Sequence, residues 1–383
     1  MTNRFSVRTG WDVGESSFAL AVREARASGR RLVDLTLANP TVCGFSYDSE
    51  SVLVPLTDAR AMTYDPDPRG TRSAREAVTG YYADHGATVD PDAVVLTTST
   101  SEGYGYLFRL LCDAGDEVLV AQPSYPLFDF LADLEDVRLR TYPLFYDYGW
   151  WIDFAELERQ IGPRTKAILV VHPNNPTGHW TAHVERERLR RICGRHGLAL
   201  LVDEVFLDYP LQESTEAVSF VAEEAPILTF VLSGMSKIAG LPQMKVGWVV
   251  TLGPEEIRRE ALGRLEVIAD TFLSMNAPAQ FALPHWLAGR ATIQEQILDR
   301  VRRNWLAAKK ADLGVLPTEA GWAAVLRIEG TAEDSVRDRG VVLHPGTFYG
   351  MEGSSRKVVS LLTPEAEFDE GLRRLAGTLE DIS

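Results

Sequence analysis

The sequence predicts an α/β protein with a large domain, built on a mainly parallel and doubly wound sheet, and a smaller α+β domain. Its 383 residues exceed the usual size of a single small domain. Between residues 93 and 205, short apolar runs alternate with amphipathic stretches of helical periodicity. This alternation is typical of a parallel sheet that carries helices on both faces.

The N-terminal part predicts two helices on either side of a rigid loop. The first helix covers 16–28 and stops at Gly29, and a short strand is expected at 32–37. Residues 64–70 contain two prolines and a glycine, which exclude a helix there. A second helix is expected at 71–85.

The repeating part follows. Strands are expected at 93–98, 117–121, 137–142, 166–172 and 198–205, with helices at 101–112, 125–134, 153–161 and 182–196. Functional sites in such sheets lie at the carboxyl ends of the strands, so the polar residues that follow each strand are the first candidates.

The pattern changes after the apolar runs 227–232 and 246–250. Helices are expected at 254–273, 277–287, 293–310 and 368–379, and strands at 322–328, 341–343 and 358–362. We therefore expect residues 46–274 to form the large domain. Residues 1–45 and 275–383 should form the small one, because their strands and helices do not continue the alternation.

Composition excludes several classes of protein. The formal net charge of -15 argues against a nucleic-acid surface or an anionic membrane as a partner. Three widely spaced cysteines, Cys43, Cys112 and Cys193, form neither a disulfide framework nor a metal-ligand cluster. No signal peptide or apolar membrane span is recognisable. We expect a cytoplasmic protein without a bound metal.

Ser99, Thr100 and Ser101 stand between an expected strand and an expected helix. The N–H groups and positive dipole end of a helix N-terminus, with added hydroxyls, form a phosphate site. A plain N-cap is the other interpretation. Dinucleotide and nucleoside triphosphate sites are not indicated, because their glycine-rich motifs are absent from the sequence.

Three further candidates follow strands. Asp203 ends a buried apolar run, where a carboxylate needs a partner such as a cationic ligand atom or a cap. Asn175 lies in an Asn-Pro-Thr-Gly segment that also fits a simple turn. Tyr125 follows Pro123 and is suited to stack on an aromatic ligand or to lie half-buried at a helix start.

Lys237 lies in a polar turn between two apolar runs, and Lys245 follows eight residues later. A lysine at the end of a buried strand loses solvation, which lowers its pKa and makes its amine nucleophilic. The alternative is a turn with two solvated lysines.

The order of these motifs resembles that of the class I and II aminotransferases, fold type I enzymes that use pyridoxal 5'-phosphate (PLP). The resemblance extends from about residue 35 to the C-terminus and is most specific around Lys237 and Asn175. It implies a homodimer with a shared active site. It also implies that the amino group of an L-amino acid moves to a 2-oxo acid by a ping-pong mechanism through a Lys237 Schiff base.

The resemblance also implies residue roles. Lys237 would bind the cofactor aldehyde and shuttle the proton, Asp203 would pair with the pyridine nitrogen, and Tyr125 would stack on the ring. Asn175 would bind the ring oxygen and lie near the substrate carboxylate. The phosphate would be held by Ser99, Thr100, Ser101, Ser236 and Lys245, and by Tyr64 of the other subunit. Asn39 lies in a segment expected to close over the substrate.

The sequence departs from the family at several positions, of which Gln243, where a small residue or Asn is common, is one. Lys245 stands where an arginine is usual and loses the bidentate fork. Phe206 replaces a tyrosine that donates to the ring oxygen, so we expect a raised pKa for the Schiff base unless Tyr209 substitutes. Val358 stands in place of the arginine that grips the substrate carboxylate. Arg356, or Arg327, is the candidate replacement.

Other interpretations follow from these departures. A β-lyase, synthase, decarboxylase or oxidase that uses PLP is the main alternative. A ligand-sensing domain would need a DNA-binding module, for which the short N-terminus leaves no room. Tyr146, Tyr148, Trp150 and Trp151 indicate either an aromatic substrate pocket or a loop packed on the core.

Overall fold

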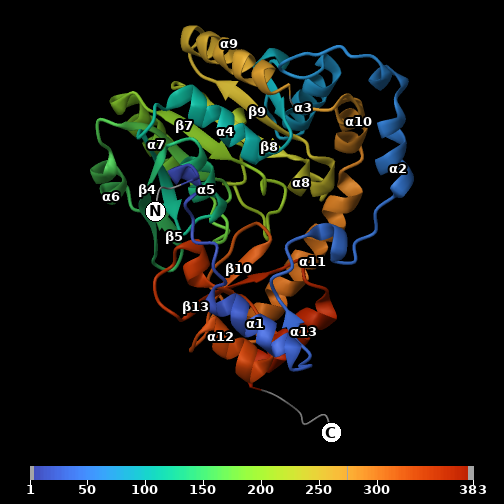
Figure 1. Ribbon diagram of the computed structural model, residues 1–383, viewed down its shortest axis with the longest axis vertical. Coiled ribbons are helices and arrows are strands. Elements are labelled where there is room, and N and C mark those ends of the chain that lie inside the picture. Colours follow the sequence, from blue (N-terminus) through green and yellow to red (C-terminus); the bar gives the residue numbers. More distant parts are fainter. Residues whose placement is uncertain (1–3, 274, 378–383) are drawn as a thin grey trace.

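The structure is a computed structural model that describes residues 4–273 and 275–377 (Figure 1). Its centre is an eight-stranded sheet with the strand order β2-β9-β8-β7-β6-β3-β4-β5. The strands are β2 (Val94–Thr97), β3 (Glu117–Gln122), β4 (Arg138–Tyr146), β5 (Trp150–Ile152), β6 (Thr165–Val171), β7 (Ala199–Asp203), β8 (Thr229–Gly234) and β9 (Gly247–Leu252). Only β9 and the short β5 run against the others. The expected mainly parallel sheet is therefore confirmed.

Alternate side chains of each central strand enter different cores. In β6, Ile168 and Val170 belong to one hydrophobic cluster, whereas Ala167 and Leu169 belong to the cluster on the other face. This period of two, with both faces buried, explains why the strands appear in the sequence as continuous apolar runs.

Helices cover the sheet on both sides (Figure 1). One cluster contains residues of α4 (Thr100–Leu111), α5 (Leu127–Leu134) and α9 (Glu255–Phe272). The other cluster contains residues of α3 (Arg72–Asp84), α6 (Phe154–Gln160), α7 (His183–His196) and α10 (Ala277–Ala288). The short helices α2 (Ser49–Leu53) and α8 (Met235–Ile238) complete this part. The doubly wound arrangement is confirmed.

A second, smaller group of strands lies below the large sheet in Figure 1. β10 (Ala323–Arg327), β13 (Arg356–Ser360) and β12 (His344–Pro345) form an antiparallel sheet, and β1 (Val33–Asp34) pairs with β11 (Val341–Val342) in parallel. Around them lie α1 (Ser17–Ala27), α11 (Ala291–Lys310), α12 (Ala332–Asp334) and α13 (Glu365–Ala376). The N-terminal segment thus joins the C-terminal third. The boundary at residue 274 falls outside the described residues, and the division into domains stays a prediction.

One region differs from the sequence-based expectation. The aromatic stretch after residue 142 continues β4 and returns as β5, so that Tyr146 pairs with Trp150. Tyr148 adopts a positive φ of 51° at the turn between them. The β-propensity of tyrosine and tryptophan, with Gly149 at the turn, accounts for this hairpin.

Two searches of the described residues bear on partners. Within residues 4–273 and 275–377, no helix is long and apolar enough to cross a bilayer. The same residues contain no cluster of three or more histidine, cysteine or acidic side chains that could hold a metal ion.

Candidate active site

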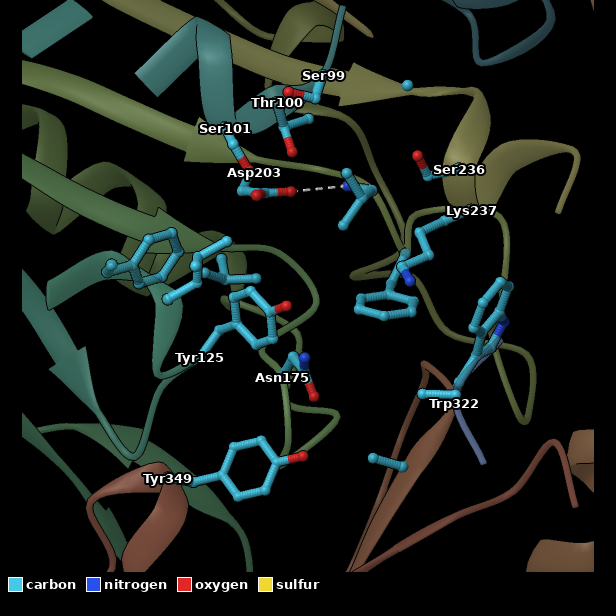
Figure 2. Close-up of a pocket in the computed structure, with 18 of the residues that line it drawn as sticks. Ser99, Thr100, Ser101, Tyr125, Asn175, Asp203, Ser236, Lys237, Trp322 and Tyr349 are labelled. Carbon is cyan, nitrogen blue, oxygen red and sulfur yellow. Dashed lines mark hydrogen bonds between the residues drawn. The ribbon is translucent and has the colours of Figure 1, made fainter. Parts of the chain in front are cut away.

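A cavity of about 290 Å³ lies where the carboxyl ends of β6, β7 and β8 face the small sheet. Most of the predicted site residues line it, although they come from distant parts of the chain (Figure 2). They are Ser99, Thr100, Ser101, Tyr125, Asn175, Asp203, Ser236, Lys237 and Lys245. The sheet brings them together because all of them except Lys245 lie at or just after the end of a strand, and Lys245 shortly precedes the antiparallel β9.

Lys237 enters the cavity from α8, directly after β8. Its Nζ lies 5.0 Å from the ring centre of Trp322 and 5.7 Å from that of Phe206 (Figure 2). Burial lowers the pKa of this amine, and the nearby Asp203 carboxylate opposes the shift. Lys237 is therefore a lysine with an increased neutral, nucleophilic fraction.

Asp203 ends β7 and is only 6% exposed. Its Oδ2 accepts a hydrogen bond of 2.8 Å from the Tyr104 hydroxyl, and its Oδ1 accepts one of 3.0 Å from the Val205 N–H. Burial raises the pKa of this carboxyl, against these hydrogen bonds and the Lys237 amine. The carboxylate is oriented by two donors and retains capacity to accept a third.

Tyr104 was not predicted from the sequence. It lies on α4 one turn after Thr100, and both residues line the cavity. The i, i+4 spacing from the expected phosphate loop is the signal that could have identified it.

The first turn of α4 meets Ser236 and Lys245 at one end of the cavity. The Ser99 hydroxyl caps the helix by accepting from the Glu102 N–H at 3.2 Å, so the N-cap interpretation holds for Ser99. Gly247 lets β9 approach this turn, because a Cβ there would lie 3.0 Å from the Thr100 nitrogen. A helix N-terminus with hydroxyls and a lysine is suited to a phosphate group.

The Asn-Pro-Thr-Gly segment holds Asn175 at the cavity. The Asn174 Oδ1 accepts a hydrogen bond of 2.8 Å from the Thr177 hydroxyl, which closes the turn. Gly178 has a φ of 69°, and a Cβ there would lie 2.5 Å from the Ala320 carbonyl oxygen. The motif is thus both a turn and the means by which this loop packs against the segment before β10.

Three predicted residues lie outside the cavity lining. Tyr64 is 80% exposed and lines a separate hollow beside the C-terminal end of α9. The Asn39 side chain accepts from the Thr41 N–H and caps a short helical turn. Arg356 places its guanidinium 5.8 Å from the centre of the Trp150 ring.

The structure decides between two pairs of alternatives that the sequence left open. Tyr209 does not supply the missing donor, because its buried hydroxyl donates to the Lys237 carbonyl at 2.6 Å and lies outside the cavity lining. The aromatic residues of the β4–β5 hairpin do not form the pocket either. Tyr146, Tyr148, Trp150 and Trp151 are all absent from its lining. Tyr146 and Trp150 pack against the core from the paired strands, whereas Tyr148 is 95% exposed and Trp151 is 44% exposed.

The small sheet supplies a wall that no local signal predicted. Trp322, His344 and Tyr349 line the cavity. Figure 2 shows Trp322 and Tyr349 at its lower side, beside the ribbon of the C-terminal segments. They come from segments more than a hundred residues after Asp203 in the chain. Only the packing of the two sheets against each other reveals them.

The family assignment follows from comparison with known proteins. The model of the family "Aminotransferase class I and II" matches residues 50–375. The chain belongs to this family. The structure is similar to an alanine aminotransferase from Pyrococcus furiosus, with a TM-score of 0.87 at 23% identity over 98% of this chain and 99% of that one. An aspartate aminotransferase from Thermotoga maritima gives 0.83 at 21% identity, over 98% and 100%.

The chain matches curated relatives over part of their length. It is 31% identical over 277 residues to the alanine aminotransferase of Mycobacterium tuberculosis strain H37Rv, which covers 71% of this chain and 64% of the relative. It is 28% identical over 270 residues to the glutamate-pyruvate aminotransferase AlaA of Escherichia coli K12, over 70% of this chain and 66% of the relative. The match thus spans slightly less than two thirds of these relatives.

A buried histidine, His179, joins the loop that follows Asn175 to the segment before β10. His179 Nε2 lies 2.9 Å from Glu185 Oε2, and its Nδ1 lies 3.6 Å from Glu319 Oε2. Burial lowers the pKa of His179, but the two carboxylates outweigh this effect and raise the pKa to about 9. The charged imidazole therefore bridges α7 and the segment that leads to Trp322.

We expect this bridge to make stability depend on pH. Because the folded pKa of about 9 exceeds the ordinary value of 6.5, the contribution is fully present below pH 6.5 and is lost as pH rises through 9. It amounts to on the order of 3 kcal/mol. In thermal unfolding scans from pH 6 to 10, His179→Gln should flatten the decrease in Tm relative to wild type. The exposed His196→Gln is the matched control and should leave the decrease unchanged.

Proposed function

We propose that the protein is a PLP-dependent aminotransferase, which moves the amino group of an L-amino acid to a 2-oxo acid by a ping-pong mechanism through a Schiff base at Lys237. The observation that carries this proposal is the cavity shared by a desolvated lysine, Lys237, and a buried, hydrogen-bonded carboxylate, Asp203. The two lie at the ends of adjacent parallel strands, β7 and β8.

The residues present fit PLP. Thr100, Ser101, Ser236 and Lys245 offer hydroxyls, a helix N-terminus and a cation for its phosphate. When bound, PLP supplies an aldehyde for amines and a ring that accepts electrons from the substrate carbon. Asp203 is positioned to hold a protonated ring nitrogen, because its remaining acceptor capacity is buried beside the cavity.

The other side chains that line the cavity would orient the cofactor and shield the Lys237 amine from water. Tyr125 covers one side of the cavity, and Asn175 offers an amide near it (Figure 2). Phe206 and Trp322 surround the Lys237 amine with apolar rings, which exclude water and favour its neutral form. The neutral amine accepts a proton at Nζ and returns it, and this is the acid–base role that we assign to Lys237.

We also propose a homodimer in which Tyr64 reaches the phosphate site of the other subunit, and in which the segment of Asn39 closes over the substrate. The strong exposure of Tyr64, away from the cavity of its own chain, supports a role across an interface. The names of the relatives support an amino acid and a 2-oxo acid as substrates. A cytoplasmic location agrees with the three free cysteines.

A second candidate is another PLP reaction on an amino acid, such as β-elimination, decarboxylation or oxidation. One observation favours it: among the described residues, no arginine lines the cavity, and Val358 occupies the position expected for the carboxylate-binding one. Without an arginine bound to its carboxylate, the substrate is less constrained to the orientation that leads to transamination.

One experiment separates these reactions. Purified protein is loaded with PLP and mixed with single amino acids, and the cofactor absorbance and the products are followed. Accumulation of pyridoxamine phosphate with an oxo acid supports the aminotransferase. Release of ammonia with pyruvate, of carbon dioxide, or of hydrogen peroxide identifies the alternative reactions. Lack of any covalent PLP adduct on Lys237, tested by borohydride reduction and mass spectrometry, contradicts both.

Phe206 provides a further test of the cofactor site. Phe206→Tyr should add a donor for the ring oxygen of PLP and so lower the pKa seen in an absorbance titration of the loaded protein. A hydrogen bond to a charged group contributes about 1.5–3 kcal/mol, which corresponds to a decrease of about one to two pH units. A wild-type value well below neutrality, or no change in Phe206→Tyr, would contradict this role.

A further inference from the structure

The cavity offers few cationic groups to a substrate. Within the described residues, its lining contains no arginine and two lysines, Lys237 and Lys245. In the proposed function Lys237 binds the cofactor aldehyde and Lys245 lies at the phosphate end, so neither is left for the carboxylate of an amino acid. A carboxylate that leaves water without a cationic partner loses favourable hydration free energy. Other donors are therefore needed for the group next to the amine-bearing carbon.

His344 lies beside the position at which an arginine was expected. β12 pairs with β13 in antiparallel register, so that His344 is directly opposite Val358, and both residues line the cavity. Side chains directly opposite each other on neighbouring strands share a face, with their Cβ atoms about 4.5–5.5 Å apart. An imidazole thus occupies the place next to Val358, which itself offers only methyl groups.

Aromatic neighbours hold the imidazole in a fixed orientation. Its ring stacks on that of Phe348, with 5.2 Å between the ring centres and 12° between the planes. The ring of Tyr349 lies at 77° to it, with 6.0 Å between the centres. Burial lowers the pKa of His344, although the Asp34 carboxylate opposes this shift. The imidazole is therefore neutral at pH 7 and has one N–H donor and one nitrogen acceptor.

Two polar groups of this wall have unused hydrogen-bonding capacity. In the part of the chain that the structure describes, neither the His344 ring nor the Tyr349 hydroxyl forms a hydrogen bond or an ion pair. Thr36 and Ser360 also line the cavity, but their hydroxyls already donate to other groups. Figure 2 shows the Tyr349 ring at the edge of the cavity below Asn175. The imidazole and the phenol are thus the groups of this wall that remain available to a ligand.

We propose that His344, together with the Tyr349 hydroxyl, binds the polar group attached to the amine-bearing carbon of the substrate, and that this group need not be charged. The substrate class then includes 2-amino amides and 2-amino alcohols beside 2-amino acids. A neutral imidazole and a phenol each donate and accept, so they pair with a carboxamide or a hydroxymethyl group as well as with a carboxylate, whereas a guanidinium only donates. The inference rests on the proposed amino transfer and extends it.

The reaction balances with the 2-oxo acid that the proposed function already supplies. The amine-bearing carbon of the donor loses its C–N bond and is oxidised to a carbonyl. The oxo carbon of the acceptor receives the amino group and is reduced. The carboxamide or hydroxymethyl group takes no part in these steps. Loss of the His344 imidazole should therefore appear in binding and in KM, and leave kcat nearly unchanged.

Binding without turnover tests the role of His344 directly. 2-Methylalanine and its amide have no hydrogen on the amine-bearing carbon, so the proton transfer that leads to turnover cannot occur, and the absorbance of the PLP-loaded protein reports their dissociation constants. We expect the two constants to lie within about tenfold of each other in wild type, since hydrogen bonds to charged and neutral groups differ on this scale. Val358→Arg should favour the acid by a further factor of about 30 or more. Comparing this ratio between proteins cancels the different basicity of the two amines.

Substitutions at residue 344 separate hydrogen bonding from packing. His344→Phe keeps a flat ring that can stack on Phe348 but removes the N–H, and it should raise both dissociation constants about three- to tenfold. His344→Gln restores a donor and an acceptor and should bring both constants to within about threefold of wild type. His285→Gln, at an exposed histidine of α10, is the matched control and should change neither constant.

Turnover completes the test. With a 2-oxo acid as acceptor, the amide and the alcohol of the best L-amino acid donor should also serve as donors, and His344→Phe should raise their KM. A wild type that turns over amino acids but neither their amides nor their alcohols, or a His344→Phe variant with unchanged dissociation constants, overturns this inference and leaves the aminotransferase intact. Equal losses in His344→Phe and His344→Gln, with a lowered Tm in both, indicate packing alone and overturn it as well. Failure to load PLP on Lys237 contradicts the proposed function, and this inference with it.

Discussion

Replacing Lys237 by alanine should abolish amino transfer, with a decrease in kcat of about 10⁴- to 10⁶-fold. The expected loss is this large because no other lysine among the described residues is positioned to replace Lys237. Lys245 is the other lysine that lines the cavity within the described residues, and it lies at the phosphate end. The half-reaction with an excess of amino acid, followed by the cofactor absorbance, measures the effect. Lys310→Ala, at the exposed end of α11, is the matched control.

The Lys237→Ala variant also tests whether the lowered pKa of Lys237 accounts for the reactivity of this amine. Burial lowers the pKa of Lys237, so wild-type protein should capture PLP covalently at pH values well below 10.4, the ordinary lysine value. Lys237→Ala should still bind PLP, but only reversibly and without a borohydride-stable adduct. Activity of Lys237→Ala within tenfold of wild type would show that another group performs the chemistry.

Replacing Asp203 by asparagine should lower kcat by about 10²- to 10³-fold or more, the effect of removing one preorganised electrostatic group. Asparagine retains the size of the side chain but has one acceptor oxygen in place of two, so it can accept from Tyr104 or from Val205 and not from both in their present positions. The variant therefore removes the charge together with one of the two local hydrogen bonds. Steady-state kinetics with the best donor measures the loss, and a thermal scan checks the fold.

Tyr104→Phe separates orientation from charge at the same site. It removes one hydrogen bond of 2.8 Å from the carboxylate and should reduce kcat far less than Asp203→Asn. The two effects should not add, because both act through the same carboxylate. An Asp203→Asn enzyme with nearly normal kcat would refute the assignment of a charged partner for the cofactor ring.

Much of the site was predictable because its chemistry follows local signals. Lys237 and Asp203 each stand at the end of an apolar run, and the geometry of a parallel sheet brings such positions together. The Ser99–Ser101 turn was recognisable as the start of a helix after a strand. The predicted roles of Tyr64 and Asn39 depend on a second subunit and on closure over a substrate, and they stay predictions.

Contacts between distant segments were not predictable. Tyr104 reaches Asp203 across 99 positions of the chain, and nothing in either local sequence indicates that they meet. Tyr209 was equally ambiguous until its hydroxyl was found to donate to the Lys237 carbonyl. The sequence also could not show that Arg327 and Arg356 are neighbours, because the register of two strands joined by a long connection depends on the packed sheet.

The sequence by itself determined the class of fold, the alternation of strands and helices, and the positions of Lys237 and Asp203 at the ends of apolar runs. The hydrophobic periodicity of a segment and its tendency to be buried depend on its own residues, so they can be recognised in the local sequence. The tertiary structure decided which wall faces Lys237, where the arginines lie, and how His179 joins the loop after Asn175 to the segment before β10. These features arise only when segments far apart in the chain pack together, since side-chain contacts across a cavity have no periodicity of their own.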